Sequence, residues 1–248
     1  ESLSDQYCGL AMGETAENLA EQYGLERSEV DEVALLSQQR SQQAWKDGVF
    51  GDEVVSIEIR NGRKQLEFRS DEHIRADTTL EELGNLPTVF KDGGVTTAGN
   101  ASGICDGAAA LVMASGEYAE EHGLHPLGRL VGWVVSGVDP ARMGIGPVPA
   151  VRQVLAQTDL TLEDMDLIEV NEAFAAQYLA VERELGLKRE RTNVHGGAIA
   201  IGHPVGTSGA RITLHLLHAL RREGKRYGLG SACIGGGQGT AVVVEAFT

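Results

Sequence analysis

Three segments of this chain carry a potentially reactive side chain, and two of them are rich in glycine. They are residues 171–174 with Asn171, 196–206 with His203, and 233–239 with Cys233. A cysteine followed by exposed backbone N–H groups, together with a histidine and an asparagine at helix starts, supplies what acyl chemistry needs. Those needs are a thiol for proton transfer, a group that stabilises a thiolate, and donors for an oxyanion.

Each of these parts also has a purely structural interpretation. A Gly-rich turn is usually only a tight turn, a single cysteine is more often a small core residue, and a histidine before proline is common in loops. The conjunction of the parts favours the chemical interpretation, provided that the fold brings the segments together.

The second half of the chain predicts a fold that would do so. Apolar periodicity and turn residues predict strands over 127–138, 166–170, 192–195, 227–233 and 240–247, and helices over 147–157, 173–185 and 206–223. The order βαβαβαββ indicates an α/β domain with a mostly parallel sheet between helix layers. All three segments follow predicted strands, and ligands in such sheets bind beyond the carboxyl ends of the strands.

The residues before 125 are less regular. We expect a helix over 28–46, a half-buried strand around 55–59 and a loop-dominated stretch over 61–101. An apolar run over 107–114 predicts a buried strand, followed by a short helix that ends at Gly123. This strand and helix have no neighbours in sequence to pair with, which indicates that part of a sheet is missing from this chain.

Composition excludes several classes of protein. The chain has 248 residues, of which 42% are hydrophobic and 23% charged, a globular composition without collagen-like or coiled-coil periods. With 21 Lys and Arg against 36 Asp and Glu, the net charge of −15 disfavours nucleic acids and anionic membranes as partners. No apolar run approaches the ~20 residues of a membrane span, and no secretory signal is visible.

Local charge and cysteine usage add two further expectations. Residues 60–75 contain five basic and three acidic side chains, which indicates either a solvated face or a small site for a polyanionic ligand. Cys8, Cys105 and Cys233 have neither C-x-x-C nor metal-ligand spacing, so we expect no disulfide framework and no metal site. A reducing cytoplasm or organelle matrix fits this usage best.

The longer motifs resemble those of the thiolase family. Asn-Glu-Ala-Phe at 171–174, the run at 196–211 and Cys-Ile-Gly-Gly-Gly-Gln-Gly at 233–239 are similar to its signature segments in order and spacing, as are 12–18 and 97–103. Residues 143–149 and the Ser-Ala-Cys at 231–233 look similar to 3-ketoacyl-CoA thiolases and acetyl-CoA acetyltransferases in particular.

The resemblance implies a role for individual residues. His203 would lower the pKa of a nucleophilic cysteine and, with a water held by Asn171, form one oxyanion hole; Cys233 would exchange a proton with the acetyl-CoA carbon, and the Gly235 N–H would serve the other hole. Coenzyme A would lie against Ser102, Ala98 and Gly99, with its nucleotide end at Arg75 and Phe90. Met12 and Phe174 would shape the acyl pocket.

Two positions depart from the family pattern. Ala11 stands where acetoacetyl-specific members often carry histidine, which indicates a longer or more varied acyl chain. His195 stands where asparagine is frequent, and the sequence assigns it no role.

The resemblance also implies that part of a thiolase is lacking. Thiolases have two βαβαβαββ halves, and their nucleophilic cysteine lies on a Cys-x-Ser-Gly-like turn well upstream of the segment at 12–18. Cys8 is followed by Gly-Leu-Ala, so it is not assigned as nucleophile. We therefore expect an N-terminal half that is mostly absent, a CoA-binding loop domain at 1–104, a closing strand and helix at 105–124, and a C-terminal half at 125–248.

The implied activity is Claisen condensation or thiolysis through a cysteinyl acyl-enzyme whose nucleophile lies outside this chain. Acyl-CoA and CoA would be substrates, no cofactor would be needed, and the complete enzyme would be a homodimer or homotetramer; this chain alone would be inactive. The alternative is a catalytically incomplete fragment or companion subunit that binds CoA or a partner chain. A nucleotide-dependent oxidoreductase is disfavoured because no G-x-G-x-x-G follows a first strand.

Overall fold

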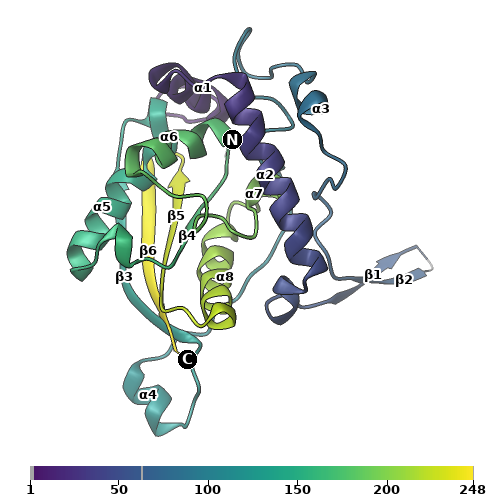
Figure 1. Ribbon diagram of the computed structural model, residues 1–248. Coiled ribbons are helices and arrows are strands. Elements are labelled where there is room, and N and C mark those ends of the chain that lie inside the picture. Colours follow the sequence, from purple (N-terminus) through teal and green to yellow (C-terminus); the bar gives the residue numbers. More distant parts are fainter. Residues whose placement is uncertain (1–2, 63, 248) are drawn as a thin grey trace.

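A mixed four-stranded sheet forms the centre of the protein in a computed structural model that describes residues 3–62 and 64–247 (Figure 1). Its strands are β3 (Gly128–Gly137), β4 (Leu167–Val170), β5 (Tyr227–Ile234) and β6 (Gln238–Ala246), in the order β3-β6-β5-β4. Only β4 and β5 run parallel, whereas β6 is antiparallel to both of its neighbours.

The α/β class is confirmed, but the prediction of a mostly parallel sheet is wrong. β5 and β6 form a hairpin, which makes them antiparallel, and β3 pairs with the free edge of β6. The strand predicted at 192–195 is reduced to a single parallel bridge between Thr192 and Ile168 of β4.

Helices cover both faces of this sheet. On one face, α8 (Ser208–Glu223) buries Ile212, Leu216 and Leu220 against Leu167 and Val244. On the other face, α5 (Pro147–Thr158) packs on β3 and β6, and α6 (Ala175–Leu185) lies beyond it together with α1 (Met12–Tyr23) and α2 (Arg27–Lys46) (Figure 1). The helices predicted at 28–46, 147–157, 173–185 and 206–223 are thus present, whereas α1 was not predicted.

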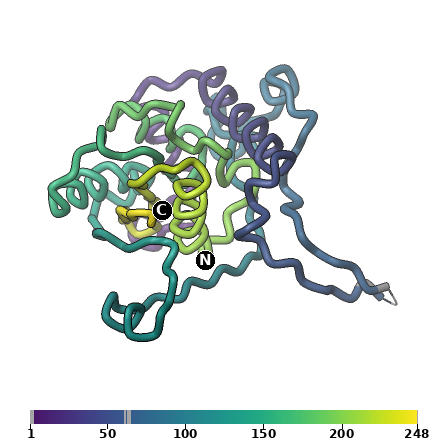
Figure 2. The backbone as a smooth tube through the Cα atoms, turned by 60° about the horizontal axis from the view of Figure 1, so that its bottom comes forward, coloured from purple at the N-terminus to yellow at the C-terminus, as the bar shows by residue number. Residues whose placement is uncertain are grey.

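The remaining elements are short. They are the 3₁₀ turns Val49–Asp52, Pro140–Ile145 and Leu162–Asp164, the hairpin β1 (Ile57–Asn61) and β2 (Lys64–Phe68), and the helices α3 (Leu80–Gly84), α4 (Gly116–Glu121) and α7 (Ala198–Ile201). The β1–β2 hairpin projects away from the body of the protein (Figures 1 and 2). Within the described residues, no helix has the length and apolar character of a membrane span.

Two predicted elements differ in their burial. Residues 107–114 form no strand, and Val112 is 100% exposed, because no described strand lies beside them to pair with. The strand around 55–59 is β1, but Ile57 is 54% exposed because only the β2 strand accompanies it.

Candidate active site

The parallel pair β4–β5 brings two of the predicted site residues to one end of the sheet. Val170 pairs with Ser231, and the Asn171 N–H donates to the Ser231 carbonyl at 2.9 Å. Asn171 therefore directly follows the end of β4. Cys233 lies on β5 two residues after Ser231, opposite Gly239 of β6. The prediction that the segments at 171–174 and 233–239 meet at the carboxyl ends of their strands is confirmed.

Asn171 and His203 form a direct side-chain pair. The Asn171 Nδ2 lies 3.3 Å from the His203 Nε2, and the His203 Nδ1 lies 2.6 Å from the Ser208 Oγ at the start of α8. Because the Ser208 hydroxyl donates to the Pro204 carbonyl at 3.3 Å, it accepts from Nδ1–H of His203. The Nε2 lone pair of a neutral ring therefore faces the site.

The electrostatics of this pair favour the neutral imidazole. Burial, and secondarily the positive charge of Arg211, lower the pKa of His203. The backbone N–H of His203 donates to the Gly103 carbonyl at 2.9 Å, which fixes the ring beside the Ser102 segment. The Asn171 Oδ1 is buried and has no partner among the described residues, so it has acceptor capacity for a bound donor.

Cys233 lies at the start of a glycine turn with restricted geometry. Burial raises the pKa of its thiol to about 12, so that the thiol is protonated at neutral pH. In the turn, Gly237 has φ +76°, and a Cβ there would lie 2.3 Å from the Val138 carbonyl oxygen. Gly235, by contrast, is exposed.

An open cleft lies beside this turn. It is lined by Met12, Gly235 and Gly236 together with residues 4–7. The Met12 sulfur lies 3.6 Å from the position that a Cβ of Gly235 would take. Asp5 is one of the lining residues, and its carboxylate accepts from the Gly236 N–H at 2.7 Å.

Ser102, Phe174 and Phe90 also lie together. The Ser102 N–H and hydroxyl both donate to the Ala173 carbonyl, at 3.0 and 2.9 Å, and Ala101 bridges to Phe174. The Phe174 and Phe90 rings meet edge to face with centroids 5.9 Å apart. Phe90 packs on Gly13, where a Cβ would lie 2.3 Å from its ring, so it is adjacent to Met12 as well.

The other residues expected at coenzyme A are more dispersed. Gly99 packs on Leu83 and Leu86, and Ala98 is exposed. Arg75 is exposed; its backbone N–H donates to Gln38 of α2 at 2.8 Å, and its carbonyl accepts from the Thr78 hydroxyl at 2.8 Å. No contact of Arg75 with Phe90 or Ser102 is recorded within the described part of the chain. Of the basic stretch at 60–75, Arg63 lies outside the described residues.

Sequence reasoning missed the buried carboxylates that support the site. Glu17 of α1 accepts from the backbone N–H groups of Val95 and Thr96, at 3.1 and 2.7 Å, and so holds the loop that leads to Ser102. Glu172, which follows Asn171 in the chain, is equally buried. Both lie inside motifs singled out above, at 12–18 and 171–174, and their place in those motifs was the signal for them.

The fold and this site define a family. The thiolase N-terminal domain model matches residues 1–117, and the thiolase C-terminal domain model matches residues 124–246. The chain belongs to the thiolase family. The prediction that the N-terminal half is mostly absent is wrong, because the N-terminal domain model matches residues 1–117. This match takes in the loop domain expected at 1–104 and most of the strand and helix expected at 105–124.

The relatives that this chain matches are named for acyl-CoA compounds. The chain is 55% identical over 244 residues to human mitochondrial 3-ketoacyl-CoA thiolase and 51% identical over 237 residues to Escherichia coli acetyl-CoA acetyltransferase, covering 98% and 96% of this chain. It spans about 62% and 60% of those two proteins.

Solved structures agree with these relatives. The human enzyme in complex with CoA superposes with a TM-score of 0.96 at 55% identity, over 100% of this chain and 61% of that one. Bacillus anthracis acetyl-CoA acetyltransferase gives a TM-score of 0.97 at 53% identity, over 99% of this chain and 62% of that one.

Proposed function

We propose that this chain supplies the acid–base and CoA-binding part of a thiolase that transfers acyl groups between 3-ketoacyl-CoA and CoA. The observation that carries the proposal is the Asn171–His203 pair, 3.3 Å apart, at the same sheet end as Cys233. The names of the relatives support the substrate class. The homologue solved with CoA supports coenzyme A as a ligand, and we assign it to the Ser102 segment.

In the thiolytic direction, a nucleophilic cysteine thiolate attacks the 3-keto carbon and the C2–C3 bond breaks. The electron pair of that bond remains on C2 of the departing acetyl-CoA, which takes a proton from the Cys233 thiol. The resulting Cys233 thiolate then takes the proton of the incoming CoA thiol, whose sulfur attacks the acyl-cysteine and releases the shortened acyl-CoA. The raised pKa of Cys233 suits the first of these transfers, since a protonated thiol is the acid required.

His203 and Asn171 together stabilise one of the oxyanions in this scheme. The neutral ring of His203 takes the proton of the nucleophilic thiol and then, as imidazolium, donates to the oxyanion. Asn171 holds a water as the second donor, for which its unpartnered buried Oδ1 has capacity. The Gly235 N–H at the exposed turn serves the second oxyanion hole.

We place the nucleophile outside residues 1–248, because Cys8 lacks the Ser-Gly that follows it in the family turn. The chain by itself would then bind CoA weakly and not thiolyse acetoacetyl-CoA. A homo-oligomer and a cytoplasmic or organelle-matrix location belong to the same proposal; several relatives are named as mitochondrial. The companion-subunit alternative differs in predicting CoA binding with no turnover in any assembly.

The test uses the protein as its organism makes it. Cys233→Ala should lower thiolysis and condensation about 10²- to 10⁴-fold, the usual contribution of an acid–base group, while acyl transfer from acyl-CoA to the protein persists in mass spectrometry. Cys8→Ala is the matched control and should keep both steps. Loss of acylation in the Cys233 variant, or in the Cys8 variant, would overturn the assignment of roles.

A further inference from the structure

Glu172 is a buried carboxylate that the scheme above does not use. It follows Asn171 directly, and 3% of the residue is exposed. Its oxygens accept from the Ser37 hydroxyl of α2 at 2.6 Å, from the Asn193 Nδ2 at 2.9 Å and from the Ile199 N–H of α7 at 3.3 Å. Three donors from three separate segments therefore converge on one side chain.

Asn193 connects this carboxylate to the end of β4. Its φ of +48° is in the left-handed region, and its amide brackets Val170, accepting from the Val170 N–H and donating to the Val170 carbonyl, both at 2.9 Å. The same Nδ2 donates to Glu172. The backbone just before Asn171 is thus fixed on one side by Asn193 and on the other by β5.

The start of α7 packs directly against the carboxylate. The Gly197 N–H donates to the Ser37 hydroxyl at 3.1 Å, and a Cβ at Gly197 would lie 2.5 Å from the Glu172 Cδ. Only glycine permits this close approach. The four residues of α7 end at Ile201, two positions before His203, so the carboxylate also sets where the His203 segment begins.

We propose that Glu172 is a positioning residue, which ties the end of β4 to the start of α7 so that the Asn171 amide reaches the Nε2 of His203. The carboxylate suits this task because all three of its partners donate. A glutamine would turn its own N–H₂ towards at least one of those donors. This inference rests on the proposed function only for the importance of the Asn171–His203 pair.

The test reads the His203 ring and needs no turnover, so that it can fail independently of the proposed function. In the neutral ring, Asn171 donates to Nε2, which opposes protonation there. Loss of the Asn171 donor from Nε2 should therefore raise the titration midpoint of His203 by about half a pH unit or more. The midpoint is measured by NMR of the ring nitrogens in the full chain. Loss of the Glu172 charge alone would lower that midpoint, so the sign separates positioning from electrostatics.

Four variants make the measurement decisive. Asn171→Ala defines the midpoint without the donor, and Glu172→Gln should move towards it. Ser37→Ala keeps the carboxylate, removes one of its donors and should move the midpoint in the same direction, which covers the case in which Glu172→Gln does not fold. Asp31→Asn is the matched control, because Asp31 is a buried carboxylate of α2 that binds Arg27 and Asn100 instead.

An upward shift in Glu172→Gln or Ser37→Ala, with none in Asp31→Asn, supports the proposal. A midpoint that is unchanged or lowered in both Glu172→Gln and Ser37→Ala overturns it, as does that result in Ser37→Ala alone if Glu172→Gln does not fold, or an equal shift in Asp31→Asn. Arg211, the cation that acts on both Glu172 and His203, is retained in every variant. CoA binding, measured by calorimetry on the same proteins, tests the proposed function separately.

Discussion

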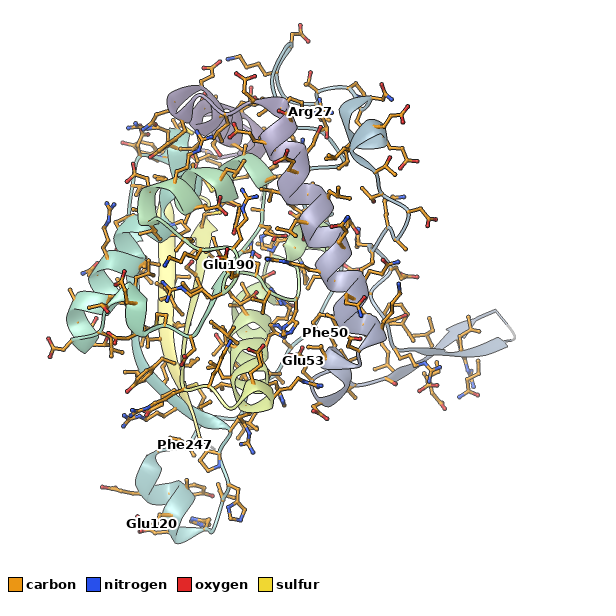
Figure 3. The ribbon with its side chains drawn as sticks, in the orientation of Figure 1. Arg27, Phe50, Glu53, Glu120, Glu190 and Phe247 are labelled. Carbon is orange, nitrogen blue, oxygen red and sulfur yellow. The ribbon has the colours of Figure 1, made fainter. Side chains whose placement is uncertain are left out.

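His195 should make the stability of this protein sensitive to acid. Its Nδ1 lies 3.1 Å from the Nε2 of His215, whose Nδ1 lies 2.7 Å from the carboxylate of Glu53. Glu53 and Phe50 lie just beyond the C-terminal end of α2, on the side of α8 (Figure 3). Burial, and then the neighbouring His215, lower the pKa of His195 from 6.5 to about 4.

The sign of the effect follows from proton linkage. Between pH 6.5 and about 4, an unfolded His195 binds a proton that the folded protein excludes, so stability is lost as the pH falls through this window. At about 1.4 kcal/mol per pH unit, the full difference corresponds to roughly 3 kcal/mol. Because the ring is only partly buried, solvent screening reduces this to about 1.5 kcal/mol.

His195→Asn removes the titration and keeps an N–H that can donate to His215. Urea unfolding at neutral pH and near pH 4.5 gives the loss of unfolding free energy on acidification for each protein. We expect the variant to lose about 1 kcal/mol less than the parent chain, the portion of the linkage that falls above that pH. His122→Asn, at an exposed histidine, is the control. Equal acid losses in the parent chain and in His195→Asn would refute the reasoning.

Two further predictions concern the CoA site and the glycine turn. Arg75→Ala should weaken CoA binding about 3- to 10-fold and leave the binding of a pantetheine thioester unaffected, since an exposed guanidinium contributes a charge-assisted contact to phosphate and nothing to the thioester end. Equal losses with both ligands would remove Arg75 from the site, and Arg69→Ala is the control. Gly237→Ala should lower the unfolding free energy by about 2 kcal/mol or more, because its Cβ would meet the Val138 carbonyl at 2.3 Å. Gly236→Ala, with a comparable φ but its nearest neighbour 3.5 Å away, should cost about 1 kcal/mol, and thermal melts that rank the two variants the other way would contradict the packing argument.

Much of the site could be predicted from local sequence. Asn171, His203 and Cys233 were identified because each lies in a short motif next to a strand or helix end, and such ends are set by nearby residues. The glycines at 186 and 224 adopt the left-handed conformation that ends α6 and α8, as their positions in the sequence indicated. These features depend on contacts within a few residues, which a single sequence displays directly.

The direction of strand pairing and the support behind the site were decided by the tertiary structure. The hairpin after Ile234 makes β5 and β6 antiparallel by a local connection, whereas the antiparallel pairing of β3 with the other edge of β6 joins segments far apart in the sequence and was decided by packing. The run at 107–114 is as apolar as a buried strand, yet it is exposed because burial requires a partner that local sequence does not specify. Glu172 gains its role from donors 135, 21 and 27 residues away, and such convergence is a property of the packed chain alone.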